Sequence, residues 1–158
     1  MAWRGKETDM AADLIRWKAQ YKLGLDEIDA QHESLLDLIN AAWQAIIRRS
    51  DPSVALALIE SLEKYSRAHF AAEENFMAVT GYPGADGHKR EHRAFMVRIG
   101  EEKERAIASG DPSLDLMHRL RDALIDHIVV SDKAYAAYTQ ASPYHDNALV
   151  SRFFRQLF

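Results

Sequence analysis

The sequence contains no cysteine among its 158 residues. Disulfides, thiolate zinc sites and iron–sulfur clusters are therefore excluded, and any metal must be held by nitrogen and oxygen atoms. No apolar run approaches the roughly 20 residues that span a bilayer, and the first residues are too charged for the apolar part of a signal peptide. We therefore expect a cytoplasmic protein with no membrane insertion.

The chain also lacks an excess of positive charge and any strand-like alternation of apolar and polar residues. It has 24 acidic and 20 basic residues, a formal net charge of −4, and so gives no electrostatic reason to expect nucleic acid as a partner. A hydrophobic content of 47% is sufficient for one packed domain of this length. We therefore expect a single all-α domain.

Apolar residues instead recur at steps of three and four along four stretches, the period of an α-helix. The stretches run from Ile28 to Ile46, from Leu58 to Met77, from His88 to Ile99 and from Leu116 to Tyr135. Turn-forming residues separate them at 51–53, 80–87 and 111–113. The pattern predicts four helices of roughly 20 to 26 residues.

Short connections between such helices favour antiparallel neighbours, so we expect an up-down-up-down four-helix bundle over residues 25–138. Residues 1–24 would form an N-terminal arm and residues 139–158 a tail within the same domain, 1–158. In the tail, apolar residues recur every four positions in two adjacent rows and predict a short amphipathic helix. The rows are Leu149, Phe153, Leu157 and Val150, Phe154, Phe158.

Histidines and carboxylates occur on the inward side of all four predicted helices. His69 precedes Glu73 by four residues, and His88 precedes His92 by four, so each pair projects from one helix face. His32 stands on the first helix, and His127 precedes Asp132 on the fourth. Five imidazoles and two carboxylates directed at one centre predict a metal site, most simply for two ions, because unpaired polar groups are costly in a bundle core. The donors alone would accept iron, zinc, copper or manganese.

The last pair does not fit an ideal helix. His127 and Asp132 are five residues apart, which corresponds to about 140° of rotation around the helix. Either Asp132 reaches the site from the flank, or the helix is locally overwound or bulged. Periodicity alone does not select Asp132 over Asp126 or Asp122. His118 and His145 lie outside these pairings, and we expect both to be surface or packing residues.

Taken in order, the four stretches resemble the hemerythrin family, the non-haem di-iron oxygen-binding proteins. The similarity extends from Trp17 to Tyr138 and includes the segment 21–32, the segment 69–74, the His88–His92 pair and His127 with Asp132. The resemblance implies two iron ions with an oxo or hydroxo bridge. It assigns His88, His92 and His127 to one iron, His32 and His69 to the other, and Glu73 and Asp132 to both. It also implies that Leu124, three residues before His127, lines an apolar O2 pocket.

The resemblance therefore implies a non-enzymatic protein that binds dioxygen reversibly for carriage, storage or delivery. An alternative is an oxygen or redox sensor or interaction module that signals through the arm or the tail, with a protein partner or self-association through the C-terminal tail. Turnover of peroxide or nitric oxide is a third possibility, but no additional acid, base or substrate pocket is visible in the sequence to support it.

Overall fold

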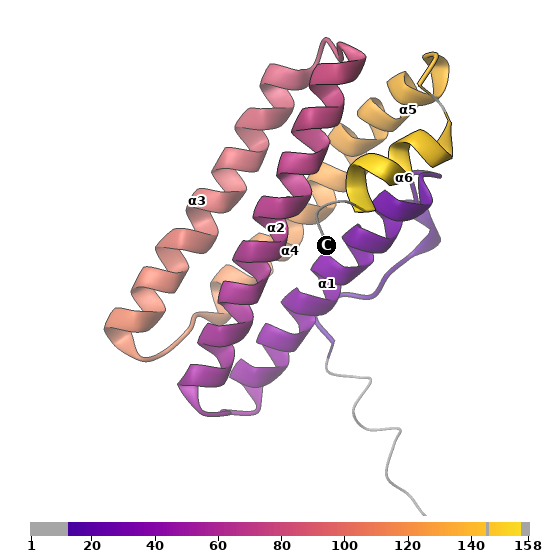
Figure 1. The fold of residues 1–158 in the computed structure, drawn as a ribbon. Helices are drawn as coiled ribbons and strands as arrows, with labels where there is room; N and C mark the ends of the chain where they lie inside the picture. Colours follow the sequence, from indigo (N-terminus) through magenta and orange to yellow (C-terminus); the bar gives the residue numbers. More distant parts are fainter. Residues whose placement is uncertain (1–12, 145, 156–158) are drawn as a thin grey trace, which may run out of the picture.

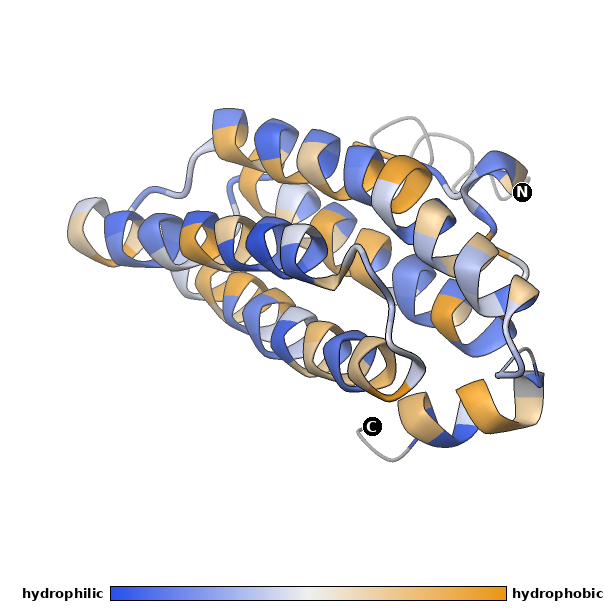
Figure 2. Ribbon diagram, turned by 90° about the horizontal axis from the view of Figure 1, so that it is seen from above, coloured by the Kyte–Doolittle hydropathy of each residue, from blue (hydrophilic) through white to orange (hydrophobic). Residues whose placement is uncertain are grey.

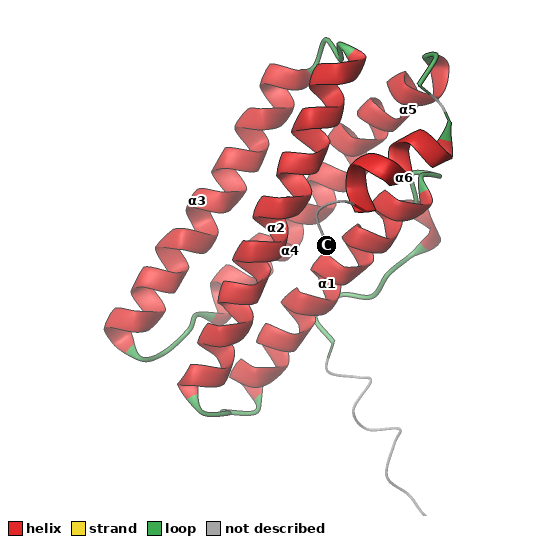
Figure 3. Cartoon of the chain, viewed as in Figure 1, coloured by secondary structure: helices red, strands yellow, loops and turns green. Residues whose placement is uncertain are grey.

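A computed structural model describes residues 13–144 and 146–155. These residues form helices connected by loops, with no strand among them (Figure 3), which confirms the predicted all-α class. The helices are α1 (Asp26–Ile47), α2 (Pro52–Thr80), α3 (Ala85–Ser109), α4 (Leu114–Asp126), α5 (Lys133–Ala141) and α6 (Asn147–Arg155). A 3₁₀ turn, η2 (Ala19–Tyr21), precedes α1, and a π-helical segment, η3 (His127–Asp132), joins α4 to α5.

The long helices lie side by side in the predicted up-down-up-down bundle (Figure 1). α1 contacts α2, α2 contacts α3, α3 contacts α4 and α4 contacts α1, so the four helices close around one interior. α4, η3 and α5 follow one another without a break and act as the fourth helix of the bundle. None of the helices in the described ranges is long and apolar enough to cross a membrane.

Most helix ends form where the turn residues predicted them, but α3 begins at Ala85, inside the turn predicted at 80–87. Asp51 caps α2 by accepting a hydrogen bond from the Ser53 backbone N–H, and Pro52 stands in the first turn of that helix. α2 ends at Gly81 with φ of 67°, a left-handed conformation that glycine adopts without steric cost. These ends keep the connections short and the neighbouring helices antiparallel.

The buried apolar residues form two clusters. Figure 2 shows hydrophilic and hydrophobic residues alternating around each helix, as amphipathic helices require. One cluster includes Leu35, Ile39, Leu62, Ile99 and Leu120, and the other includes Ile28, Phe76, Tyr135, Val150 and Phe154. On α1, His32 lies between Ile28 of the second cluster and Leu35 of the first, and on the fourth helix Asp132 lies between Ile128 of the first and Tyr135 of the second.

Helix α6 of the tail packs on its own bundle. α6 contacts α1 and α2, with Val150 2% exposed and Phe154 fully buried. Beside the bundle, α6 lies next to the start of α1 (Figure 1). The predicted amphipathic tail helix is thus confirmed for residues 147–155, whereas Leu157 and Phe158 lie outside the described residues.

Candidate metal centre

The structure brings all seven predicted ligand residues together in the interior. α1 contributes His32, α2 contributes His69 and Glu73, α3 contributes His88 and His92, and η3 contributes His127 and Asp132. His127 is 8% exposed, and the other six are 3% exposed or less. We call His88, His92 and His127 the three-histidine group, and His32 and His69 the two-histidine group.

The π-helical segment η3 explains how His127 and Asp132, which are five residues apart, reach the same centre. In a π-helix the hydrogen bonds connect residues five apart, so those residues lie on the same face one turn apart. His127 and Asp132 are the first and last residues of η3, and His127 Nε2 lies 3.1 Å from Asp132 Oδ1. Of the two geometries that the sequence left open, the bulged helix is the one observed. Asp122 and Asp126 are exposed instead.

Glu73 lies between the two histidine groups and presents one oxygen to each. Its Oε1 lies 3.1 Å from His69 Nε2 and 3.7 Å from His32 Nε2. Its Oε2 lies 3.0 Å from His92 Nε2 and 3.4 Å from His88 Nε2. Both oxygens of this carboxylate therefore face imidazole nitrogens, on opposite sides of the centre.

Asp132 repeats this arrangement from the fourth helix. Its Oδ2 lies 3.1 Å from His32 Nε2, whereas its Oδ1 lies 3.1 Å from both His88 Nε2 and His127 Nε2. Each carboxylate thus spans the two groups. Within the three-histidine group, His92 Nε2 and His127 Nε2 face each other at 3.1 Å.

Several of these buried atoms have no hydrogen-bonding partner among the described residues. They are His32 Nε2, Glu73 Oε1, and Asp132 Oδ1 and Oδ2. An unsatisfied buried polar atom costs about 1–3 kcal/mol, and a metal ion would give each of these lone pairs a partner. Two sets of ligand atoms converge closely enough to hold a cation, and Glu73 belongs to both sets. One set adds the three-histidine group and Asp132 to Glu73, and the other adds the two-histidine group. The residues present therefore fit a metal centre.

Charge balance in the metal-free site follows from the same contacts. Burial opposes a charge on His32, but Asp132 and Glu73 outweigh it and raise the pKa of His32 to about 9. The same carboxylates overcome burial and raise the pKa of His88 to about 10. For His69, burial dominates and lowers the pKa. Burial would raise the pKa of Glu73, but the surrounding histidines hold it well below its ordinary value. In the metal-free site these pKa values favour protonated His32 and His88 near neutral pH, so a cation would compete with those protons.

Three of the histidines make a hydrogen bond through Nδ1, the ring nitrogen that points away from the centre. His69 Nδ1 lies 2.7 Å from Gln31 Oε1, His92 Nδ1 lies 3.0 Å from Glu74 Oε1, and His127 Nδ1 lies 2.6 Å from Glu91 Oε2. Such partners fix the ring orientation and leave Nε2 free for a metal. The sequence alone did not predict these contacts. The only signal was that Gln31, Glu74 and Glu91 each adjoin a predicted ligand in the sequence.

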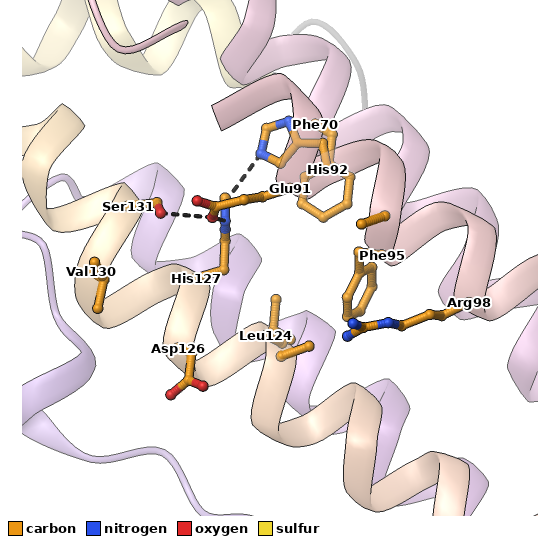
Figure 4. Close-up of a pocket in the computed structure, with 12 residues that line it drawn as sticks. Phe70, Glu91, His92, Phe95, Arg98, Leu124, Asp126, His127, Val130 and Ser131 are labelled. Carbon is orange, nitrogen blue, oxygen red and sulfur yellow. Dashed lines mark hydrogen bonds and ion pairs between the residues drawn. The ribbon is translucent and has the colours of Figure 1, made fainter. Parts of the chain in front are cut away.

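A cavity of about 400 Å³ opens beside the three-histidine group, between α3 and the fourth helix (Figure 4). Leu124, Phe70 and Phe95 supply apolar walls, and the cavity reaches His92 and His127, but neither His32 nor His69 lines it. The ring of Phe70 stacks on His92, with centroids 3.9 Å apart, and also lies 5.7 Å from the ring of His69. Phe70 therefore separates the cavity from the two-histidine group.

His118 lies outside both converging sets of ligand atoms. Its ring packs edge-on against Trp43, with centroids 5.0 Å apart, in agreement with a packing role. His145 lies outside the described residues.

Comparison with known proteins identifies the family. The family model described as the hemerythrin HHE cation binding domain matches residues 23–138. This chain belongs to the hemerythrin family. It is 34% identical to a bacteriohemerythrin of Stenotrophomonas maltophilia (strain R551-3) over 128 residues, which are 81% of this chain and 83% of that protein. It is 32% identical to a bacteriohemerythrin of Pseudomonas aeruginosa (strain LESB58) over 119 residues, 75% of this chain and 77% of that one.

A solved structure supports the fold independently. The crystal structure of a hemerythrin leucine-to-tyrosine variant superposes with a TM-score of 0.74, covering 79% of this chain and 96% of that one at 24% identity. The resemblance noted in the sequence is thus confirmed. Hemerythrin membership implies non-haem iron, and the buried histidines and carboxylates form a cluster able to hold a metal.

Proposed function

We propose that this hemerythrin-family protein binds O2 reversibly at a di-iron centre. The observation that carries the proposal is the orientation of Glu73 and Asp132, since each directs one oxygen at the three-histidine group and the other at the two-histidine group. A carboxylate placed in this way is suited to bridging two cations. The relatives named bacteriohemerythrin support the oxygen-binding role.

In this proposal His88, His92 and His127 hold one iron, and His32 and His69 hold the other. Glu73 and Asp132 would serve both irons, so the second iron would have one protein ligand fewer than the first and would leave room for a small ligand. Iron would supply the redox-active position at which dioxygen binds. The protein would supply neutral imidazoles, buried carboxylates and exclusion of water.

The cavity beside His92 and His127 gives a small ligand a route as far as Phe70, whose ring centroid lies 5.7 Å from that of His69. Leu124 is 1% exposed and lines the cavity together with Phe70 and Phe95. Such apolar side chains would limit the access of water and protons to the centre, and this favours reversible binding over loss of reduced oxygen. We assign Leu124 to the O2 pocket on this basis, with Phe70 at the boundary to the two-histidine group.

Non-enzymatic carriage, storage or delivery of oxygen in the cytoplasm is the role that we propose for this site. A sensor role is the second candidate, and one observation favours it. The tail packs on the bundle, and the Phe154 backbone carbonyl accepts a hydrogen bond from Gln31, the partner of His69.

Anaerobic loading with Fe(II), followed by metal analysis and an oxygen titration monitored by visible spectroscopy, tests the proposal. We expect about two iron ions per chain and a visible band that appears with O2 and disappears when O2 is removed. One iron per chain, or stoichiometric zinc in protein from iron-replete cells, would refute the di-iron assignment. A band that forms but never reverses would refute the carrier role.

A further inference from the structure

A chain of two hydrogen bonds connects His69 to the backbone of the tail helix. His69 Nδ1 lies 2.7 Å from Gln31 Oε1, and Gln31 Nε2 lies 3.2 Å from the carbonyl oxygen of Phe154. Gln31 is 5% exposed, and Phe154 is fully buried with its ring 6.1 Å from the ring of His69. The amide of Gln31 therefore lies between the metal centre and α6, sheltered from water.

The chemistry of these atoms determines which atom donates and which accepts in each of the two hydrogen bonds. A backbone carbonyl can only accept a hydrogen bond, so the Gln31 NH2 group must face Phe154 and the Gln31 carbonyl oxygen must face His69. His69 Nδ1 must then carry the proton and donate it. Nε2 consequently keeps its lone pair, and this is the nitrogen that faces Glu73 at 3.1 Å. The docked tail thus selects the tautomer of His69 that can bind a metal.

The other outer partners do not depend on the tail. His92 and His127 donate to the carboxylates of Glu74 and Glu91, which can accept from an imidazole in any orientation of the carboxylate. An amide differs, because rotation by half a turn would present its NH2 group to His69 Nδ1 and favour the wrong tautomer. Of these three partners, only Gln31 must therefore be oriented by another group, and the Phe154 carbonyl does this.

We propose that Gln31 is a positioning residue that couples metal binding at His69 to docking of α6. The inference rests on the proposed function, in which His69 is a metal ligand. Docked α6 holds the metal-binding tautomer, and because coupling is reciprocal, a bound metal should stabilise the docked position of α6. α6 lies beyond residues 23–138, the part of the chain that the family model matches, so the coupling would be an addition to the matched domain.

Hydrogen exchange of the α6 backbone amides in the full-length protein tests this coupling. Exchange is measured in the metal-free protein and after anaerobic loading with Fe(II), with the iron content determined in each sample. We expect loading to slow exchange in residues 147–155 by about fivefold or more, the lower end of ordinary coupling between sites.

Two variants separate the two hydrogen bonds. Gln31→Glu keeps an acceptor for His69 but loses the donor to Phe154, so Fe(II) binding should persist while the response of α6 to Fe(II) is lost. Gln31→Leu removes both bonds, so the response should be lost and Fe(II) affinity should fall by about 10- to 100-fold. Gln44→Leu is the matched control, since it makes the same change on the same helix, and both properties should remain as in the parent protein.

A merely structural role for Gln31 would alter α6 exchange equally with and without metal. The proposal is overturned if either Gln31 variant, with iron bound, retains the full response of α6. It is also overturned if α6 does not respond in the parent protein although iron is bound, which would leave the proposed function intact. If the parent protein binds no Fe(II), the proposed function fails instead, and the same exchange measurement with Zn(II) still tests the coupling. Absence of a response to bound Zn(II) would overturn the coupling as well.

Discussion

The two histidine groups share the same bridging carboxylates but have different surroundings. The three-histidine group is backed by the carboxylates of Glu74 and Glu91, whose side chains are 32% and 50% exposed, and it adjoins the cavity. The two-histidine group is backed by the buried amide of Gln31 and covered by α6, while His32 Nδ1 has no hydrogen-bonding partner among the described residues. One side of the centre therefore faces solvent-accessible charge, and the other faces neutral groups supplied by Gln31 and by α6.

This difference predicts that the two histidine groups bind metal with unequal affinity. Hydrogen bonds from imidazole to a carboxylate are roughly twice as strong as those to a neutral acceptor, and they make the ring a better metal ligand. The three-histidine group has two such bonds and one additional ring. We therefore expect it to bind metal more tightly, and the two-histidine group to be the adjustable side.

The largest expected effect comes from removing the element that the two groups share. Glu73→Ala should lose both irons, because its two oxygens serve both groups, whereas His32→Ala should retain about one iron in the three-histidine group. Metal analysis of the purified proteins measures the difference. His118→Ala is the control and should leave the iron content unchanged. If His118→Ala strips iron as severely as Glu73→Ala, the division between ligands and packing histidines is wrong.

The packing of α6 over the two-histidine group should depend on the burial of apolar side chains of α6. Phe154→Ala removes a fully buried ring and should lower the free energy of unfolding by about 3–5 kcal/mol. Arg155→Ala is the neighbouring control, because its side chain is 73% exposed and its contact with Glu27, at 3.4 Å, should contribute less than about 1 kcal/mol. Urea unfolding of both variants measures this. Equal losses would mean that surface charge holds α6 in place.

On the opposite side, Glu91→Ala removes the acceptor of His127. Metal affinity of the three-histidine group should fall by about 10- to 100-fold, because the ring loses its fixed orientation and part of its basicity. Competition with a chelator measures the affinity. Glu101→Ala, an exposed change on the same helix, is the control and should have no effect. An affinity that is unchanged in Glu91→Ala would remove the proposed advantage of the three-histidine group.

The smallest expected effect concerns the cavity wall. Leu124→Ala enlarges the cavity and Leu124→Asn makes it polar, so each should shorten the lifetime of the oxygenated protein by about tenfold, equivalent to about 1.4 kcal/mol in the barrier. The decay of the visible band after oxygenation measures the lifetime. Leu120→Ala, a buried change one turn away that does not line the cavity, controls for the loss of stability. Unchanged lifetimes in both Leu124 variants would place this residue outside the O2 pocket.

Local patterns were sufficient for the bundle and for every member of the cluster except Asp132. A period of 3.6 residues determines which side chains share a helix face, so the pairs His69 with Glu73 and His88 with His92 could be predicted to point inward together. Turn residues determined where the helices end. The family likeness of the four stretches then selected Asp132, which periodicity alone could not do.

The tertiary structure decided what depends on contacts between distant segments. The π-helical turn at 127–132 was one of two geometries that the spacing of His127 and Asp132 left open, and only the structure shows which one forms. The cavity exists only where α3 and the fourth helix leave space between packed side chains. The bond from Gln31 to Phe154 joins residues 123 positions apart, and helical periodicity carries no information across that separation. The sequence alone therefore determined the bundle and which residues face its interior, and packing determined how the two histidine groups are supported.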